Sequence, residues 1–374
     1  MTTADPFEIF LVAIPGLEGP LCAEARQAGF KAKTVEGGVV IKGGWPDVWR
    51  ANLILRGASR VMARIDSFPA PLLAQLDRRA HRVPWRTYLR KDVPVRVEAT
   101  CRASRIYHSG AAAERIGRAI TDETGATISA DAGVAVKARI ENDLCTISID
   151  TSGEPLHKRG HKSEVNKAPM RETMAALFLR QCGFDGRETV VDPMCGSGTF
   201  VIEAAEMAAG LLPGRSRQFA FEDLATFDAA AWHALRGGGT VVAPALRFYG
   251  SDHDPGAVRM SRANAERAGV AACTEFVACS ISDTRAPSGP PGLVIVNPPY
   301  GDRIGERGAL VALYRALGAT LMARFAGWRV GLITSDPQLA SATGLPFALD
   351  APPVLHGGLR VTLYRTGALP EPHG

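Results

Sequence analysis

Hydrophobic positions along the chain follow two different patterns, and the change between them divides the sequence. Before residue 156 the elements alternate irregularly: Phe7–Ile14 and Val93–Thr100 have the pattern of strands, and Gly110–Thr124 that of an amphipathic helix. Val134–Ile140 and Leu144–Asp150 predict a hairpin, because three polar residues separate two apolar runs with strand character. This order of elements predicts a mixed α+β region.

From residue 169 onward, short apolar strands alternate with longer helical segments. The expected strands are Thr189–Val191, Phe248–Ser251, Phe276–Cys279, Leu293–Val296, Val330–Thr334 and Leu359–Tyr364. Strands this short and this apolar are typical of a mostly parallel sheet buried on both faces, so the pattern predicts a Rossmann-like, doubly wound α/β domain. We therefore expect domains at residues 1–65, 66–155 and 169–374, with a linker at 156–168.

Composition and charge narrow the class of protein. No apolar run approaches the ~20 residues that a membrane helix needs, which argues against a membrane protein. The seven cysteines are scattered without a C-x-x-C pair, so we expect reduced thiols, a cytoplasmic location and no metal site. Residues 1–165 hold 24 Lys and Arg against 19 Asp and Glu, whereas the rest holds 19 of each. The excess suits a polyanionic partner, although an ordinary charged surface would look the same.

A glycine-rich segment follows the first strand of the doubly wound region. It begins at Asp192 and continues through Pro193, Met194, Cys195, Gly196, Ser197, Gly198 and Thr199. Ligands of such sheets bind at the carboxyl ends of the strands, and glycines let the backbone approach them closely. The dinucleotide fingerprint is absent because residue 201 is Val, and no Lys-Ser/Thr pair follows as in a phosphate loop. An adenosine ligand without phosphates, S-adenosylmethionine, fits better; a purely structural turn stays an alternative.

Two acids follow the next strand, and they suggest separate roles. Asp254 precedes Pro255, a common start of a helix, so we assign Asp254 to the helix cap. Asp252 is then free to accept hydrogen bonds from the ribose hydroxyls of the cofactor. Sixty residues separate Asp192 from Asp252, more than a minimal βαβ unit needs, so residues 210–247 are expected to form an insertion.

The strand Leu293–Val296 ends in Asn297, Pro298, Pro299 and Tyr300. The exocyclic amine of a base is a poor nucleophile, because its lone pair is delocalised into the ring. The Asn297 side-chain oxygen and a neighbouring backbone carbonyl can accept its two N–H bonds and direct the lone pair towards a methyl donor. Tyr300 offers a face on which a flipped base can stack. A strand-terminating Asn-Pro turn is the alternative.

These motifs resemble the class I S-adenosylmethionine-dependent RNA methyltransferases that carry a THUMP domain, in particular the 23S rRNA guanine-N2 methyltransferases and their tRNA relatives. The resemblance is carried by Leu156–His161, Asp192–Thr199 and Asn297–Arg303. It implies a ferredoxin-like domain, a THUMP RNA-binding domain and a catalytic domain that binds S-adenosylmethionine and releases S-adenosylhomocysteine. A tRNA guanine-N2 or an RNA adenine-N6 substrate, or a catalytically silent RNA-binding assembly factor, remains an alternative; the sequence indicates no oligomeric state.

Two further sets of residues complete the expected sites. The family usually has an acid after the third strand to hold the adenine amine; here Ser280 occupies that place and Asp283 follows three residues later, so both are candidates. For RNA we expect contacts from basic residues of the N-terminal part and the linker. They are Arg86, Arg90, Lys158, Arg159 and Lys162. The first two could equally belong to a solvated helix face.

Overall fold

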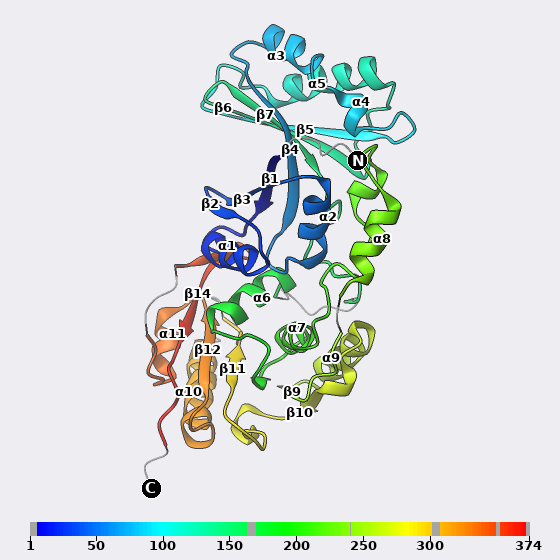
Figure 1. The fold of residues 1–374 in the computed structure, drawn as a ribbon. Coiled ribbons are helices and arrows are strands. Elements are labelled where there is room, and N and C mark those ends of the chain that lie inside the picture. Colours follow the sequence, from blue (N-terminus) through cyan, green and yellow to red (C-terminus); the bar gives the residue numbers. More distant parts are fainter. Residues whose placement is uncertain (1–5, 163–169, 240, 301–306, 349–351, 372–374) are drawn as a thin grey trace. The chain divides into compact units, whose positions relative to one another are not determined.

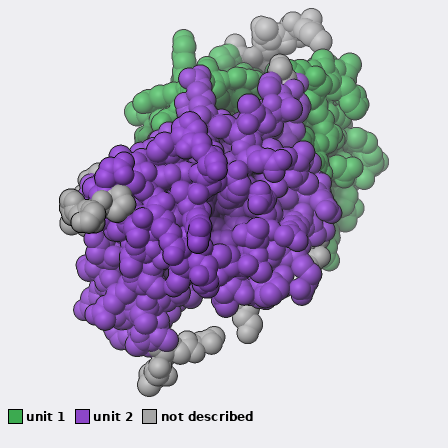
Figure 2. Space-filling view, turned by 90° about the horizontal axis from the view of Figure 1, so that it is seen from below, with its two compact units in different colours: residues 1–13, 21–156, 214–238 green, residues 14–20, 157–213, 239–374 purple. Residues whose placement is uncertain are grey.

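A computed structural model describes residues 6–162, 170–239, 241–300, 307–348 and 352–371 (Figure 1). The chain forms two compact units, coloured separately in Figure 2. Unit 1 comprises Met1–Ala13, Leu21–Leu156 and Gly214–Gly238, and unit 2 comprises Ile14–Pro20, His157–Pro213 and Gly239–Gly374. The chain therefore enters unit 2 briefly at residue 14 and returns to unit 1 twice, at residues 21 and 214, before it completes unit 2.

Unit 1 is built on a seven-stranded sheet in the order β2-β3-β1-β4-β7-β6-β5. Its strands are β1 (Phe7–Val12), β2 (Ala32–Val35), β3 (Gly38–Gly43), β4 (Arg60–Pro69), β5 (Val95–Arg102), β6 (Val134–Glu141) and β7 (Leu144–Asp150). Neighbours are antiparallel except β5 and β6. The predicted hairpin is confirmed by the pairing of β6 with β7.

Strand β4 makes this sheet continuous. It pairs with β1 through residues 60–64 and with β7 through residues 62–69, with an irregularity between Arg64 and Asp66. The expected boundary after residue 65 thus lies within a strand, and the division into domains 1–65 and 66–155 stays a prediction. The helices of this part of the chain are α1 (Glu18–Gln27), α2 (Trp45–Ile54), α3 (Leu73–Ala80), α4 (Trp85–Tyr88) and α5 (Ser109–Thr124).

The insertion expected at residues 210–247 has an unexpected place. Its segment Gly214–Gly238, with the 3-10 turn η1 (Ala220–Asp223) and helix α8 (Ala229–Gly237), belongs to unit 1. Phe219 and Phe221 stack with ring centroids 5.1 Å apart, and Trp232 meets the Phe221 ring edge-on at 5.0 Å. Phe221 also lies 6.2 Å, between ring centroids, from Trp49 of α2, so the aromatic cluster packs against the rest of unit 1.

Unit 2 contains the predicted doubly wound sheet, in the order β10-β9-β8-β11-β12-β14-β13. The strands are β8 (Val190–Asp192), β9 (Phe248–Asp252), β10 (Thr274–Ala278), β11 (Leu293–Val296), β12 (Arg329–Thr334), β13 (Val354–His356) and β14 (Leu359–Arg365). Strands β8 to β12 are parallel and β14 is antiparallel to β12. Strand β8 lies between β9 and β11, so the order reverses there, and the carboxyl ends of β8 and β11 form the expected ligand crevice.

Helices cover both faces of this sheet (Figure 1). They are α6 (Glu172–Gln181), α7 (Thr199–Ala208), α9 (Pro255–Ala268), α10 (Arg307–Arg324) and α11 (Pro337–Ala342), with short turns η2 (Ala271–Cys273) and η3 (Ile281–Asp283). Helix α10 packs through Leu317 and Leu321 onto Val294 and Leu332 of the sheet. Among the described helices of both units, none combines the length and the apolar character needed to cross a bilayer.

Candidate active site

The loop between β8 and α7 places two glycines in left-handed conformations, with φ of +54° at Gly196 and +81° at Gly198. A Cβ on Gly196 would meet no atom within 4 Å, whereas one on Gly198 would lie 3.1 Å from the side chain of Ser261. The two glycines therefore serve different purposes. Gly198 allows α7 and α9 to pack closely, and Gly196 leaves its backbone facing open space.

Helix α9 holds this loop through buried polar side chains. The Ser261 hydroxyl donates to the Gly196 carbonyl at 2.9 Å, and the Asn264 amide donates to the Ser197 carbonyl at 3.1 Å. Both side chains are fully buried. The sequence prediction missed both residues, although polar residues three positions apart on the inward face of a helix were a usable signal.

Two carboxyl groups border the loop. Asp192 is buried and accepts a hydrogen bond from the Met194 N–H at 3.0 Å. Burial raises the pKa of its carboxyl to about 8. Asp252 accepts the Gly196 N–H on one oxygen (2.9 Å) and the Asp254 N–H on the other (3.0 Å), so each oxygen keeps a lone pair for another donor.

The predicted helix cap is confirmed. Asp254 is the N-cap of α9, its side chain accepts the Gly256 N–H at 2.7 Å, and Pro255 is the first helical residue. Asp252, the last residue of β9, is therefore not used as the cap of this helix.

The Asn297–Tyr300 turn follows β11, the parallel neighbour of β8, so turn and glycine loop leave the sheet at the same edge. The Oδ1 atom of Asn297 is shielded from solvent and has no hydrogen-bond partner among the described residues. A buried acceptor without a donor is costly, which favours a ligand N–H at this position. Tyr300 is half-buried, and burial raises its pKa to about 12. The rest of the motif, Gly301 to Arg303, lies outside the described residues.

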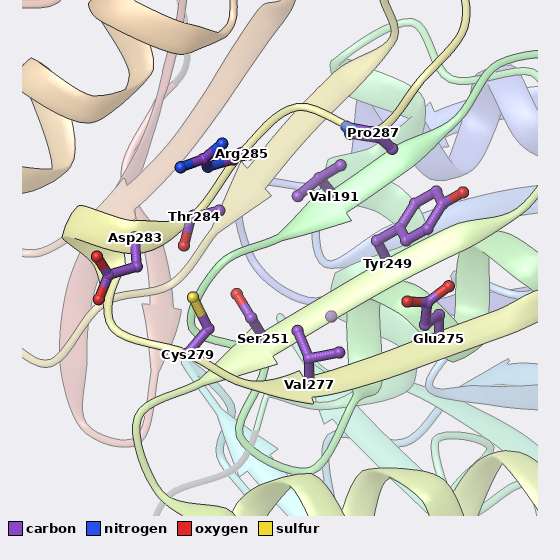
Figure 3. Close-up of a pocket in the computed structure, with 11 residues that line it drawn as sticks. Val191, Tyr249, Ser251, Glu275, Val277, Cys279, Asp283, Thr284, Arg285 and Pro287 are labelled. Carbon is purple, nitrogen blue, oxygen red and sulfur yellow. The ribbon is translucent and has the colours of Figure 1, made fainter.

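A pocket of about 300 Å³ lies on the sheet face beside β9 and β10 (Figure 3). The segment from Cys279 to Gly292 crosses there with only the short turn η3, so no helix covers this part of the sheet. Ser251 and Cys279 lie at the carboxyl ends of the two strands, and Asp283 lies at this end of the pocket. The Ser280 hydroxyl donates to Asp283 Oδ2 at 2.6 Å, so the two predicted adenine contacts form one hydrogen-bonded pair.

The connector residues require a correction. Arg159 is 2% exposed and pairs with Glu203 of α7 at 3.1 Å. Lys162 pairs with Glu172 at 3.0 Å and donates to the Thr199 hydroxyl at 2.8 Å. Arg159 thus pairs with the second turn of α7 and Lys162 with its first residue, and because both cations are engaged within the protein, the structure does not support them as RNA contacts.

The other expected RNA contacts lie on the surface. Lys158 and Arg86 are exposed, and the Arg86 guanidinium donates to the Glu123 carbonyl. Arg90 is exposed and pairs with Asp92 at 2.6 Å. Their role in RNA binding stays a prediction.

Two further observations concern Cys195 and the grouping of possible metal ligands. Cys195 is buried and its thiol pKa is raised by burial, which keeps it from acting as a nucleophile. In the parts of the chain that the structure describes, no three His, Cys, Asp or Glu side chains are grouped to hold a metal ion.

Two family models match the chain. A model described as the RMKL-like methyltransferase domain matches residues 159–362, more than half of the chain. A model described as the RlmL ferredoxin-like domain matches residues 8–62.

Curated relatives named ribosomal RNA large subunit methyltransferase K/L are similar to nearly the whole chain. The protein from Psychromonas ingrahamii is 33% identical over 355 residues, which cover 90% of this chain and 47% of that protein. The protein from Syntrophotalea carbinolica is 34% identical over 365 residues, which cover 91% of this chain and 51% of that protein. The chain therefore spans about half the length of the curated relatives it matches.

Two solved structures share the complete fold. A possible methylase from Clostridium difficile 630 has a TM-score of 0.88 at 28% identity, covering 99% of this chain and 100% of its own. A putative methyltransferase complexed with SAH has a TM-score of 0.86 at 27% identity, covering 98% of this chain and 99% of its own.

Proposed function

Because the chain belongs to the family of RMKL-like methyltransferase domains, we propose that it transfers a methyl group from S-adenosylmethionine to the exocyclic N2 amine of a guanine in 23S rRNA. The choice of rRNA is supported by the names of the curated relatives. One observation carries the proposal: the Oδ1 atom of Asn297 is buried and has no hydrogen-bond partner among the described residues. Asn297 directly follows β11, which pairs with β8, the strand that leads into the glycine loop.

The residues around the crevice suit the proposed cofactor. Gly196 leaves room for a ligand where a Cβ would stand, and Asp252 has lone pairs for two ribose hydroxyls. Asp283, with the Ser280 hydroxyl fixing its carboxylate, can accept the adenine amine beyond the end of β10. The remaining proposed cofactor contacts are Asp192, Pro193, Cys195, Ser197, Gly198, Thr199 and Asn297. When bound, S-adenosylmethionine supplies an electrophilic methyl group.

The turn residues prepare the amine for this transfer. Asn297 Oδ1 and the Pro298 carbonyl accept its two N–H bonds, which favours a pyramidal nitrogen with its lone pair directed at the methyl carbon. Pro298 and Pro299 lack N–H groups and stiffen the turn. Tyr300 stacks on the flipped base and, as a neutral phenol, takes no proton.

RNA binding is assigned to the basic N-terminal part, in which we place the THUMP domain. Lys158, Arg86 and Arg90 contact phosphates, and folded RNA is recognised mainly by its shape. An RNA substrate places the enzyme in the cytoplasm.

The test uses the purified chain, tritiated S-adenosylmethionine, and either deproteinised 23S rRNA or tRNA from cells that lack the enzyme. Mass spectrometry of the digested nucleosides should show N2-methylguanosine from rRNA. Label in N6-methyladenosine, or in tRNA alone, would replace the proposed substrate, and no label in any RNA would overturn the proposal in favour of a silent assembly factor.

Replacing Asn297 provides the decisive variant. Asn297→Ala should lower turnover about 10²- to 10³-fold, because the amine loses an acceptor that acts in the transition state. The affinity for S-adenosylhomocysteine, measured by calorimetry, should stay within twofold of wild type. Loss of both would mean that the turn is structural.

A further inference from the structure

Tyr314 of α10 lies against the catalytic turn from inside the protein. Its ring is fully buried in the cluster that joins α10 to β11 and β12. Its hydroxyl oxygen lies 3.3 Å from the Pro299 carbonyl oxygen and 3.2 Å from the Thr334 hydroxyl oxygen. Burial raises the pKa of this phenol, so the hydroxyl keeps its proton.

The hydrogens around Tyr314 can be placed by counting donors. A phenol has one proton, so Tyr314 can donate to only one of its two neighbours. The Pro299 carbonyl can only accept, whereas the Thr334 hydroxyl has a proton of its own. Thr334 also accepts the Asp336 N–H at 3.2 Å. The geometry makes the Tyr314 hydroxyl the donor in both contacts, so the Pro299 carbonyl and the Thr334 oxygen compete for its single proton.

The turn depends on a donor from outside because of its own composition. Pro298 and Pro299 have no N–H with which to hold the turn, and proline fixes φ but leaves ψ free to rotate. The Asn297 side-chain oxygen has no partner among the described residues, so it does not anchor the turn either. A hydrogen bond to the Pro299 carbonyl fixes the orientation of the peptide plane between Pro299 and Tyr300. That plane determines the path of the chain on both sides.

We propose that Tyr314 is a positioning residue of the methyl transfer: by donating to the Pro299 carbonyl, it holds the turn in the conformation in which Asn297 presents its amide oxygen to the substrate amine. This inference rests on the proposed function for its catalytic consequence. Its structural part, that the phenol proton holds the turn, stands on the geometry of unit 2 alone.

The test compares Tyr314→Phe with Tyr364→Phe. Tyr364 is buried in the same cluster and loses the same hydroxyl, but it belongs to β14 and has no hydrogen bond to the turn among the described residues. Tyr314→Phe should lower kcat about 10-fold or more, since small misplacements of a catalytic group cost up to ~10²-fold. The KM for S-adenosylmethionine and the affinity for S-adenosylhomocysteine should stay within twofold. Tyr364→Phe should keep the wild-type kcat.

Thr334→Val separates the two hydrogen bonds of Tyr314. It removes the second acceptor of the phenol and leaves the Pro299 carbonyl as the acceptor of its proton, so kcat should fall less than twofold. A kcat loss in Thr334→Val equal to that in Tyr314→Phe would show that the hydrogen bond to Thr334, and not the one to Pro299, supports catalysis, and would overturn the proposal. An unchanged kcat in Tyr314→Phe would overturn the proposal while the proposed function stands.

Crystal structures of wild type and Tyr314→Phe with S-adenosylhomocysteine keep the inference testable if the proposed function fails. Should the wild-type chain methylate no RNA, the proposed substrate is wrong, and the structures decide about Tyr314. A rotated Pro299 carbonyl in the variant supports the inference, and an unmoved turn overturns it. Melting temperatures of both phenylalanine variants show whether a loss of folding explains any difference.

Discussion

At the scale of single residues, the crevice of unit 2 combines several groups, each of which is unfavourable for the folding free energy. Gly196 and Gly198 adopt left-handed conformations, Asp192 is a carboxyl without a cation partner in the described hydrogen bonds and ion pairs, and Asn297 Oδ1 has no described donor. Each costs folding free energy that the surrounding packing must offset. Such costs are expected where a ligand, absent during folding, later supplies the missing partner.

The two glycines allow a paired prediction. Gly198→Ala should lower the free energy of unfolding by about 2 kcal/mol or more, because strain from positive φ adds to a 3.1 Å contact with Ser261. Gly196→Ala should lower the free energy of unfolding only by the strain of its positive φ, about 1 kcal/mol, since its Cβ meets no atom of the protein. Because this Cβ points into the open space proposed for the cofactor, S-adenosylhomocysteine binding should weaken at least 10-fold. Denaturant unfolding and calorimetry measure the two effects. Equal losses of stability in both variants would contradict the different roles.

Asp192 predicts a dependence of stability on pH. Its pKa is about 8 in the fold against 3.8 in the unfolded chain, so between these values the folded protein binds one proton more. Its contribution is complete below pH 3.8 and is lost as pH rises to about 8, at up to ~1.4 kcal/mol per pH unit. Asp192→Asn mimics the protonated carboxyl and should therefore gain stability relative to wild type as pH rises from 5 to 8.

Unfolding midpoints at several pH values measure this gain, in the absence of any ligand. Asp185→Asn, at an exposed position of unit 2, is the matched control and should run parallel to wild type. A constant difference between Asp192→Asn and wild type across this range would mean that the buried carboxyl is ionised in the fold.

At the scale of elements, α7 joins the connector to the glycine loop. After its first residue, Thr199, the helix is apolar except for Glu203 and Glu206, and both acids are buried. Glu203 pairs with Arg159, and Glu206 lies 3.7 Å from His161. The connector thus stabilises the helix whose N-terminus borders the crevice.

Two neighbouring residues of the connector should consequently behave in opposite ways. Arg159→Ala breaks the buried ion pair with Glu203 and should cost about 3–5 kcal/mol of stability. Lys158→Ala should leave the melting temperature unchanged, weaken RNA binding and reduce the salt dependence of binding by about one phosphate contact. Arg159→Met combined with Glu203→Leu should recover most of the stability. Normal folding of Arg159→Ala together with weakened RNA binding would restore the sequence-based assignment.

At the scale of the whole molecule, the return of residues 214–238 links the folding of the two units through the chain. Arg217 donates to the carbonyls of Ser152 (3.1 Å) and Pro155 (2.8 Å) and stacks on Phe219. These contacts attach the segment 214–238 to residues 152–155 of unit 1, although in the sequence the segment lies between two parts of unit 2. Unit 1 is therefore complete only after all of α7 has been synthesised.

Trp232→Ala tests this dependence. The side chain is 1% exposed, and its removal should cost unit 1 about 3–5 kcal/mol. Hydrogen exchange should accelerate in α2 and β7 of unit 1, while β8 and β11 keep their protection and S-adenosylhomocysteine binding is retained. Faster exchange confined to the segment 214–238 itself would show that unit 1 does not depend on it.

Features that depend on local order could be predicted from the order of residues along the chain. The doubly wound sheet, the β6–β7 hairpin, the glycine loop, the Asp254 cap and the position of Asn297 at the end of a buried strand all follow from periodicity and turn chemistry over a few residues.

The burial of polar residues, and the partners with which they interact, became visible only in the folded structure. Arg159 resembles any other basic residue of the connector until Glu203, 44 positions later, pairs with it. Tyr314 and the residues 214–238 likewise acquire their places from partners outside their own segments. The physical reason is that burial of a charge or a hydroxyl is favourable only where a specific partner satisfies it, and no local pattern encodes that partner.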